Sequence, residues 1–281
     1  MLRERIKELS KGELVIDYRG GPEVISAGEQ ASASRKSVVD LAWVPAGSYL
    51  GQVPCLEAME LSRITALDER KTGFYNTMLD LHKKTGLYYL GRGMPLQEGA
   101  GLFYIFTNKK VDTPKDLAGQ KIGRGVLALH FLRELGIVSV SVARGEEYTA
   151  LETKVIHGVV SAMPGLIGYS CQEVVKYVID HPFGVFNVMT LINLNAWDKL
   201  PQHLQKVLTD AQLDVERDWP AKQAEIDAKS WVKLKEAKVE VIKFAPPDAK
   251  WFLDTYYRTE WEPLLKKYPD IAPKLKDMVS K

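Results

Sequence analysis

The chain has 281 residues, and its 38 Lys and Arg against 36 Asp and Glu leave a formal net charge of +2. Nucleic-acid-binding proteins carry a clear excess of basic residues, so this near-balance argues against that class of protein. Hydrophobic residues make up 46% and charged residues 26%, which excludes a disordered chain, and the length predicts two domains. No apolar run approaches the ~20 residues of a membrane helix, and the charged opening at 1–18 is not a signal peptide.

Helices and strands are expected to alternate along the first half of the chain. Leu2, Ile6 and Leu9 recur at helical spacing, and Lys11-Gly12 ends that helix. Hydrophobic and polar residues alternate over 13–18, which predicts a strand, and further strands are expected over 40–44, 87–90 and 102–107. Two further helices are expected over 27–39 and 68–84.

The second half continues this alternation. Strands are expected over 121–122, 138–142, 159–163, 185–192 and 239–244. Helices are expected over 127–135, 146–156, 173–179 and 201–237, and Pro220 is expected to break the last of these. Strands that alternate with helices indicate an α/β fold with largely parallel sheets.

Motifs for catalysis or metal binding are absent from the sequence. None of the five histidines stands in HExxH or in a cluster of metal-ligand spacing, and there is no GxSxG elbow or P-loop. We therefore expect no metal, no cofactor and no catalytic residues. The segment from Lys121 to Gly125 runs from a strand through glycines into a helix, with Arg124 inside it. It is either an anion clamp or a tight turn with a solvated arginine.

Trp43 and Tyr49 follow a short strand at its carboxyl end, where open α/β sheets bind ligands. Ligand contact and core packing are both open for them. Arg92, in a glycine-rich loop, is a further cation and is expected to be solvated.

Five segments, in order, resemble the solute-binding proteins of TRAP transporters, the DctP type. They are KGELVIDYRGG at 11–21, SVVDLA at 37–42, TNKKVDTPKDLAGQKI at 107–122, LG with EEYTAL at 135–151, and NLNAWDKLP at 193–201. The resemblance implies a two-domain, periplasmic-binding-protein-like α/β fold with hinge strands and a long connecting helix. It also implies a periplasmic receptor that binds an organic acid between two lobes and delivers it to membrane permease subunits.

The expected lobes are 1–98 with 195–235, and 99–194 with 236–281. Cys55 and Cys171 then fall in opposite lobes, so we expect no bond between them. The family begins with a strand that precedes the point matched by Met1. A natural start upstream of Met1 is therefore expected, with the signal peptide and first strand not present in this chain.

The resemblance also places the ligand site. The usual carboxylate-binding arginine position holds Gly123, with Arg124 next to it. A second arginine position falls on Phe103, an asparagine position on Ser161, and an aromatic position on Arg144. The expected pocket lies between the lobes and is lined by the aromatic residues Trp43, Tyr49 and Phe103. Its cation is expected to be Arg124 or Arg144, and Ser161 is expected to be a small polar contact.

A mostly apolar pocket with one cation favours an aromatic or hydrophobic carboxylate. The leading hypothesis is a transport receptor that is neither an enzyme nor inserted in the membrane. The alternatives are a sensory ligand-binding module and an enzyme on a two-domain α/β scaffold.

Overall fold

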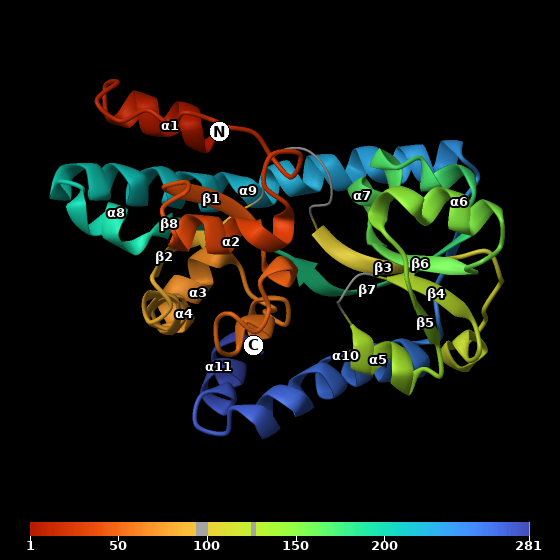
Figure 1. Ribbon diagram of the computed structural model, residues 1–281. Helices are drawn as coiled ribbons and strands as arrows, with labels where there is room; N and C mark the ends of the chain where they lie inside the picture. Colours follow the sequence, from red (N-terminus) through yellow and green to blue (C-terminus); the bar gives the residue numbers. More distant parts are fainter. Residues whose placement is uncertain (94–100, 125–127, 281) are drawn as a thin grey trace. The chain divides into compact units, whose positions relative to one another are not determined.

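The computed structural model describes residues 1–93, 101–124 and 128–280 (Figure 1). The chain divides into two compact units, each assembled from separate segments of the sequence. Unit 1 contains Met1–Leu96, Asn187–Lys222 and Tyr268–Lys281, and unit 2 contains Gln97–Phe186 and Gln223–Lys267.

Unit 1 has a three-stranded sheet in the order β1-β8-β2. Its strands are β1 (Leu41–Pro45), β2 (Leu87–Arg92) and β8 (Val188–Asn193), and β8 runs antiparallel to both neighbours. Every residue of β8 is buried, which explains its nearly continuous apolar sequence. The helices are α1 (Leu2–Leu9), α2 (Ala27–Arg35), α3 (Ala66–Thr72), α4 (Phe74–Lys83), α8 (Leu194–Lys199) and α11 (Ala272–Val279), with 3₁₀ turns at Ala46–Ser48 and Leu56–Met59.

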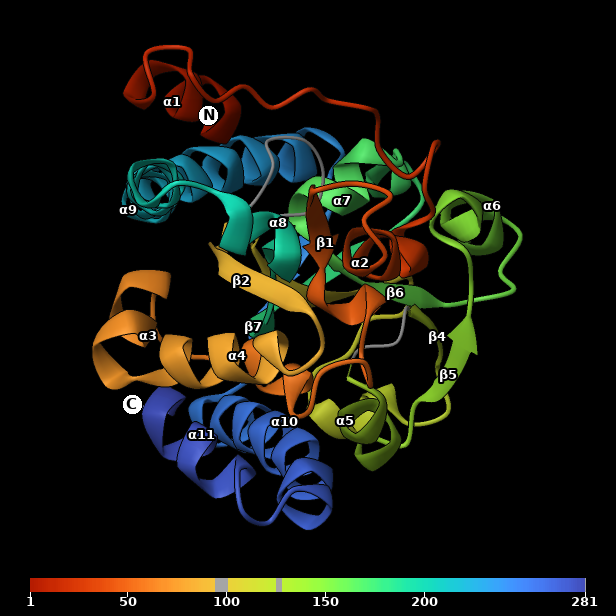
Figure 2. The same cartoon turned by 60° about the vertical axis from the view of Figure 1, so that its left-hand side comes forward.

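One core of unit 1 joins segments that are distant in sequence. Leu2 and Ile6 on the apolar face of α1 pack with Leu208 and Val215 on the first half of α9 (Gln202–Glu236). Figure 2 shows α1 beside α9 and α11 beside α3 and α4. The chain passes from unit 1 to unit 2 inside α9, between Lys222 and Gln223.

Unit 2 has a six-stranded sheet in the order β5-β4-β6-β3-β7-β9. Only β3 runs antiparallel to its neighbours among these strands, so the other five are parallel to one another. The strands are β3 (Gly101–Thr107), β4 (Lys121–Arg124), β5 (Val138–Ser141), β6 (Gly158–Ala162), β7 (Tyr177–Phe186) and β9 (Glu240–Ile242).

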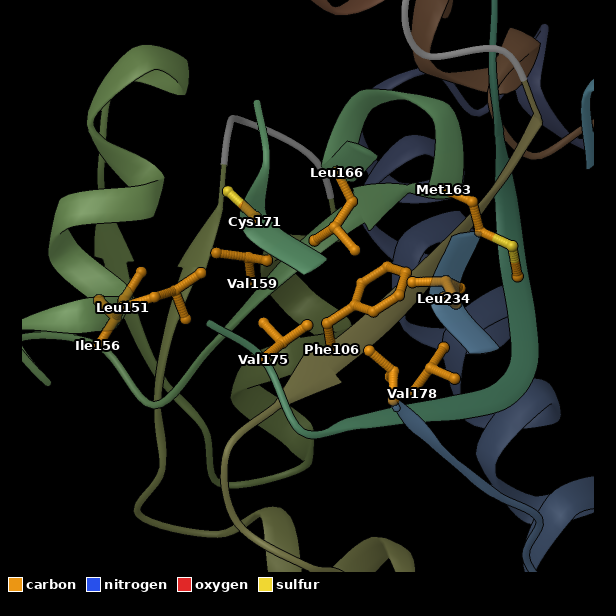
Figure 3. Close-up of a cluster of buried hydrophobic side chains, with 11 residues drawn as sticks. Phe106, Leu151, Ile156, Val159, Met163, Leu166, Cys171, Val175, Val178 and Leu234 are labelled. Atoms are coloured by element: carbon orange, nitrogen blue, oxygen red, sulfur yellow. The ribbon is translucent and has the colours of Figure 1, made fainter. Parts of the chain in front are cut away.

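Helices cover both faces of this sheet. The helices are α5 (Leu129–Glu134), α6 (Glu147–Glu152), α7 (Met163–Gly168) and α10 (Pro246–Lys267), with 3₁₀ turns at Pro114–Leu117, Arg144–Glu146 and Cys171–Glu173. Within this unit α6 and α7 lie on one face, and α5 and α10 lie on the other (Figures 1 and 2). Figure 3 shows the core beneath α6 and α7, where Phe106, Val159, Leu166 and Leu234 meet.

The bounds of the units differ from those of the expected lobes chiefly at three places. Residues 223–235 belong to unit 2, because the boundary between the units lies inside α9. Residues 188–193 belong to unit 1 because β8 forms the centre of its sheet. Residues 268–281 also belong to unit 1, because α11 packs against α3 and α4. The chain crosses between the units at Phe186 and Asn187, where the single strand expected over 185–192 is in fact two strands.

Several local predictions were wrong for identifiable reasons. The helix expected over 68–84 is two helices, because Gly73 adopts the left-handed conformation at φ +85°. The helix expected over 173–179 is a 3₁₀ turn followed by β7, because Val178 and Ile179 favour a strand that β3 can pair with. Pro220 does not break α9, and residues 13–18 form no strand with the described part of the chain.

Candidate functional site

The carboxyl ends of three parallel strands of unit 2 lie side by side at one edge of the sheet. β5, β4 and β6 are neighbours in that order and end at Ser141, Arg124 and Ala162. In open α/β sheets, ligands bind outside this edge, because the loops that follow the strands project there. This edge of unit 2 is therefore the candidate binding site.

Arg144 and Ser161 contact each other at this edge. Arg144 begins the 3₁₀ turn that follows β5, and Ser161 is the next-to-last residue of β6. The Nη1 nitrogen of Arg144 donates to the Ser161 hydroxyl oxygen at 3.1 Å. The Arg144 side chain is 37% exposed, whereas Ser161 is fully buried. Two residues that the sequence proposed for the ligand site therefore meet, across the end of β4.

Glu147, the first residue of α6, completes this cluster. The same Nη1 nitrogen lies 3.1 Å and 3.4 Å from the two carboxylate oxygens of Glu147, whose side chain is only 3% exposed. Burial raises the pKa of the Glu147 carboxyl, and the charge of Arg144 opposes that shift. No pattern in the sequence distinguishes this residue, because Glu146 beside it is also acidic and is exposed.

The contacts of Arg144 leave part of its guanidinium available. All of its hydrogen bonds within the described residues are made by Nη1, so its Nε and Nη2 donors have no partner there. A planar guanidinium presents Nε and Nη2 as a pair of parallel donors that matches the two oxygens of a carboxylate. The arrangement can therefore accept a carboxylate through two hydrogen bonds.

Cys171 lies close enough to feel the charge of Glu147. Burial raises the pKa of its thiol to about 11, and the Glu147 carboxylate adds to that shift. The thiol is therefore protonated at neutral pH and is a poor nucleophile. Cys55 and Cys171 are both buried, and no disulfide joins them. Within residues 1–93, 101–124 and 128–280, no group of three or more His, Cys, Asp or Glu side chains could hold a metal ion.

Arg124 ends β4, where it pairs with Ser141 of β5. Its backbone thus lies at the same edge, between the strands that lead to Arg144 and Ser161. The position of its side chain lies outside the described part of the chain, as do residues 125–127.

Phe103 lies at this edge but on the other face of the sheet. In the β3–β6 pair, Phe103 is opposite Ala162 and Tyr104 is opposite Ser161. Because opposed residues share a face and successive residues alternate, the Phe103 and Ser161 side chains point to opposite sides. Phe103 is 5% exposed and packs edge-on against Phe186, at 6.1 Å between ring centroids.

The sequence did not identify the aromatic residue opposite Ser161, or the second aromatic residue that packs against it. Tyr104 shares the face of Ser161 and is half-buried. Its ring meets that of Trp231, from the second half of α9, edge-on at 6.1 Å between centroids. Both rings pack at the border of the core shown in Figure 3. The aromatic residue on the face of Ser161 is therefore Tyr104, one residue further along β3 than the expected Phe103.

The two aromatic candidates of unit 1 have packing contacts. Tyr49 is 1% exposed, and its hydroxyl oxygen lies 3.0 Å from Nε2 of His82. Trp43 lies in the middle of β1 opposite Thr190 and packs against the core that joins α1 and α9. These contacts match the core-packing interpretation of both residues.

Arg92 is not solvated as expected. It ends β2 with its side chain 11% exposed, and its guanidinium donates to Glu69 Oε2 at 2.8 Å. Further donors reach Asn187 Oδ1 and the Ile64 carbonyl oxygen, both at 2.7 Å. All three donor nitrogens are thus used inside unit 1, which makes Arg92 a structural residue.

The chain matches known proteins along nearly its whole length. The model of the family described as bacterial extracellular solute-binding protein, family 7 (DctP) matches residues 1–267. A solute-binding protein from Albidiferax ferrireducens is 22% identical over 265 residues, which cover 92% of this chain and 77% of that protein.

Solved structures give the same result. A TRAP periplasmic solute-binding protein from Sulfitobacter with bound β-D-galacturonate has a TM-score of 0.83 at 19% identity, covering 100% of this chain and 93% of that one. One from Desulfovibrio salexigens with bound orotic acid has a TM-score of 0.85 at 18% identity, covering 99% and 91%. One from Rhodoferax ferrireducens with bound malonate has a TM-score of 0.79 at 18% identity, covering 99% and 88%.

These matches confirm the resemblance and the fold class that the sequence indicated. Across the described residues, no helix combines the length and the hydropathy that a membrane-spanning segment requires. The chain belongs to the bacterial extracellular solute-binding protein family 7, the DctP family, and has the two-domain fold of TRAP periplasmic solute-binding proteins.

Proposed function

We propose that the chain is the periplasmic receptor of a TRAP transporter, that it binds a small aromatic or hydrophobic carboxylate, and that it delivers this ligand to membrane permease subunits. Family membership supports the transport role. Solved proteins of the same fold hold β-D-galacturonate, orotic acid and malonate, all of which are organic acids.

The geometry of Arg144 is the main observation in support of a carboxylate ligand. Its Nη1 nitrogen is held by Glu147 and Ser161, while Nε and Nη2 have no partner in the described residues. A fixed guanidinium loses little side-chain freedom when a ligand binds, so more of the interaction energy is retained as affinity. Arg144 is thus the proposed carboxylate anchor.

The aromatic preference follows from the neighbours of Ser161. Tyr104 lies opposite Ser161 on the same face of the sheet, and Trp231 packs against Tyr104. Aromatic side chains on the same face of the sheet as a fixed cation suit a flat or apolar ligand body better than a heavily hydroxylated one.

Thermal-shift screening tests this proposal. The panel contains aromatic monocarboxylates, aliphatic mono- and dicarboxylates and hexuronates, each beside its uncharged amide. A ligand at one hundred times its Kd stabilises the folded protein by about 2.7 kcal/mol, which raises the melting temperature by roughly 5 °C or more. We expect at least one aromatic carboxylate to do this and its amide to fail. Equal shifts with the amide, or no shift with any carboxylate, would contradict the proposal.

Delivery needs a separate experiment. Membrane vesicles from the producing organism should accumulate the radiolabelled carboxylate only when the purified chain is added outside. Uptake at the same rate without the chain would contradict the receptor role.

A further inference from the structure

Glu147 places a buried negative charge against the proposed anchor. Its carboxylate contacts Nη1 of Arg144, and its side chain is 3% exposed. Arg144 has no other acidic partner within the described residues. The Glu147 carboxylate therefore occupies Nη1 of the guanidinium, and Nε and Nη2 remain available to a ligand.

The charge balance of this pair limits the charge that a ligand can bring. Arg144 and Glu147 together have no net charge, so a bound monocarboxylate shares one positive group with Glu147. A dicarboxylate brings a second negative charge, which Glu147 also repels. Such repulsion is screened less in a partly buried site than in open solvent.

We infer that Glu147 is a specificity-determining residue, whose fixed charge makes the site select monocarboxylates over dicarboxylates. This inference rests on the proposed function, because it takes Arg144 as the ligand anchor. Glu147 would thus discriminate between ligands by their net charge without having to contact them.

Glu147 also orients Arg144, and the substitution Glu147→Gln separates the two roles. The glutamine amide oxygen still accepts a hydrogen bond from Nη1, so the guanidinium keeps its position, but the negative charge is removed. Loss of orientation lowers the affinity for every carboxylate alike. Loss of the charge removes the repulsion of two carboxylates in a dianion but of only one in a monoanion. It therefore raises the affinity for the dianion relative to that for the monoanion.

The chain offers a matched control one residue away. Glu146→Gln removes the same charge by the same chemical change, but Glu146 is exposed and its side chain makes no hydrogen bond within the described residues. Any effect of net protein charge alone appears equally in both variants.

The test measures Kd by titration calorimetry for two ligand pairs that differ by one carboxylate, benzoate with terephthalate and butyrate with succinate. The proteins are the wild type, Glu147→Gln, Glu146→Gln and Arg144→Ala. We expect the ratio of dicarboxylate to monocarboxylate affinity to rise about tenfold in Glu147→Gln and to stay within twofold in Glu146→Gln.

The outcomes separate the inference from the function on which it rests. An unchanged ratio in Glu147→Gln, with Arg144→Ala still impaired, overturns the role of Glu147 alone. Equal rises in both glutamine variants do the same, because they report net charge only. Unaltered binding in Arg144→Ala, or no binding of any carboxylate by the wild type, overturns the proposed anchor and the inference together.

Discussion

The Nη1 nitrogen of Arg144 lies 3.1 Å from the hydroxyl oxygen of Ser161 and connects the turn after β5 with the end of β6. β4 lies between these two strands, so the arginine side chain crosses the carboxyl end of β4. The contact brings a half-exposed cation to the edge where α/β sheets bind ligands.

Acidification should destabilise the protein through His82. Its ring lies in the core of unit 1, where Nδ1 donates to the Met78 carbonyl oxygen and Nε2 accepts from the Tyr49 hydroxyl. Burial lowers the pKa of His82 to about 4, from 6.5 in an unfolded chain. The unfolded state therefore binds a proton first as pH falls, and stability declines from about pH 6.5 towards pH 4.

Between pH 7 and pH 5 this loss amounts to about 2 kcal/mol. Urea denaturation at both pH values measures it, and His82→Gln should reduce the difference by that amount. His203→Gln serves as the control, because His203 is exposed. Equal pH dependence in the wild type and in His82→Gln would refute the assignment.

Removing Arg92 alone should destabilise unit 1. Arg92→Met leaves the Glu69 carboxylate, 2% exposed, without its charge partner. An unpaired buried charge costs about 3–5 kcal/mol, whereas replacing both partners by apolar residues costs much less. Urea denaturation should therefore find Arg92→Met/Glu69→Leu more stable than Arg92→Met. A double variant that is less stable than the single one would show that the pair is not coupled in this way.

Gly158 should not tolerate a side chain. It begins β6 between β3 and β4, and a Cβ atom there would lie 2.1 Å from the Phe106 carbonyl oxygen. Because backbone of a central strand cannot move away cheaply, Gly158→Ala should lower the free energy of unfolding by about 3 kcal/mol.

Gly28→Ala is the matched control for that substitution. Gly28 lies in α2, and a Cβ atom added there would lie 3.9 Å from the nearest atom, the Ser48 carbonyl oxygen. Alanine should stabilise this helix by about 0.5–1 kcal/mol. Thermal denaturation compares the two variants, and a Gly158→Ala variant as stable as the wild type would contradict the packing of β6.

Local patterns of sequence predicted much of the framework. The expected strand at 40–44 corresponds to β1 at Leu41–Pro45, and that at 102–107 to β3 at Gly101–Thr107. Both follow from short apolar runs, for which local composition is sufficient. The break between β7 and β8 at Asn187 was not predictable, because it depends on which sheet each half of the apolar run joins.

The site was only partly predictable for a similar reason. Resemblance to a family identified Arg144 and Ser161, which contact each other. It also selected Phe103, but the register of β3 against β6 places Tyr104 on the face of Ser161. A shift of one residue reverses the face of a side chain, and register is fixed by tertiary pairing. The burial of Glu147 likewise arises only when α6 packs on the sheet.

Titration calorimetry with Arg144→Ala tests the central claim most directly. The ligand is the best carboxylate of the thermal-shift panel, and Arg133→Ala, at an exposed position of α5, is the control. A hydrogen-bonded charge pair contributes about 1.5–3 kcal/mol, so Arg144→Ala should weaken binding by roughly ten- to a hundredfold. The control should bind as the wild type does. A Kd for Arg144→Ala within twofold of the wild type would contradict the account.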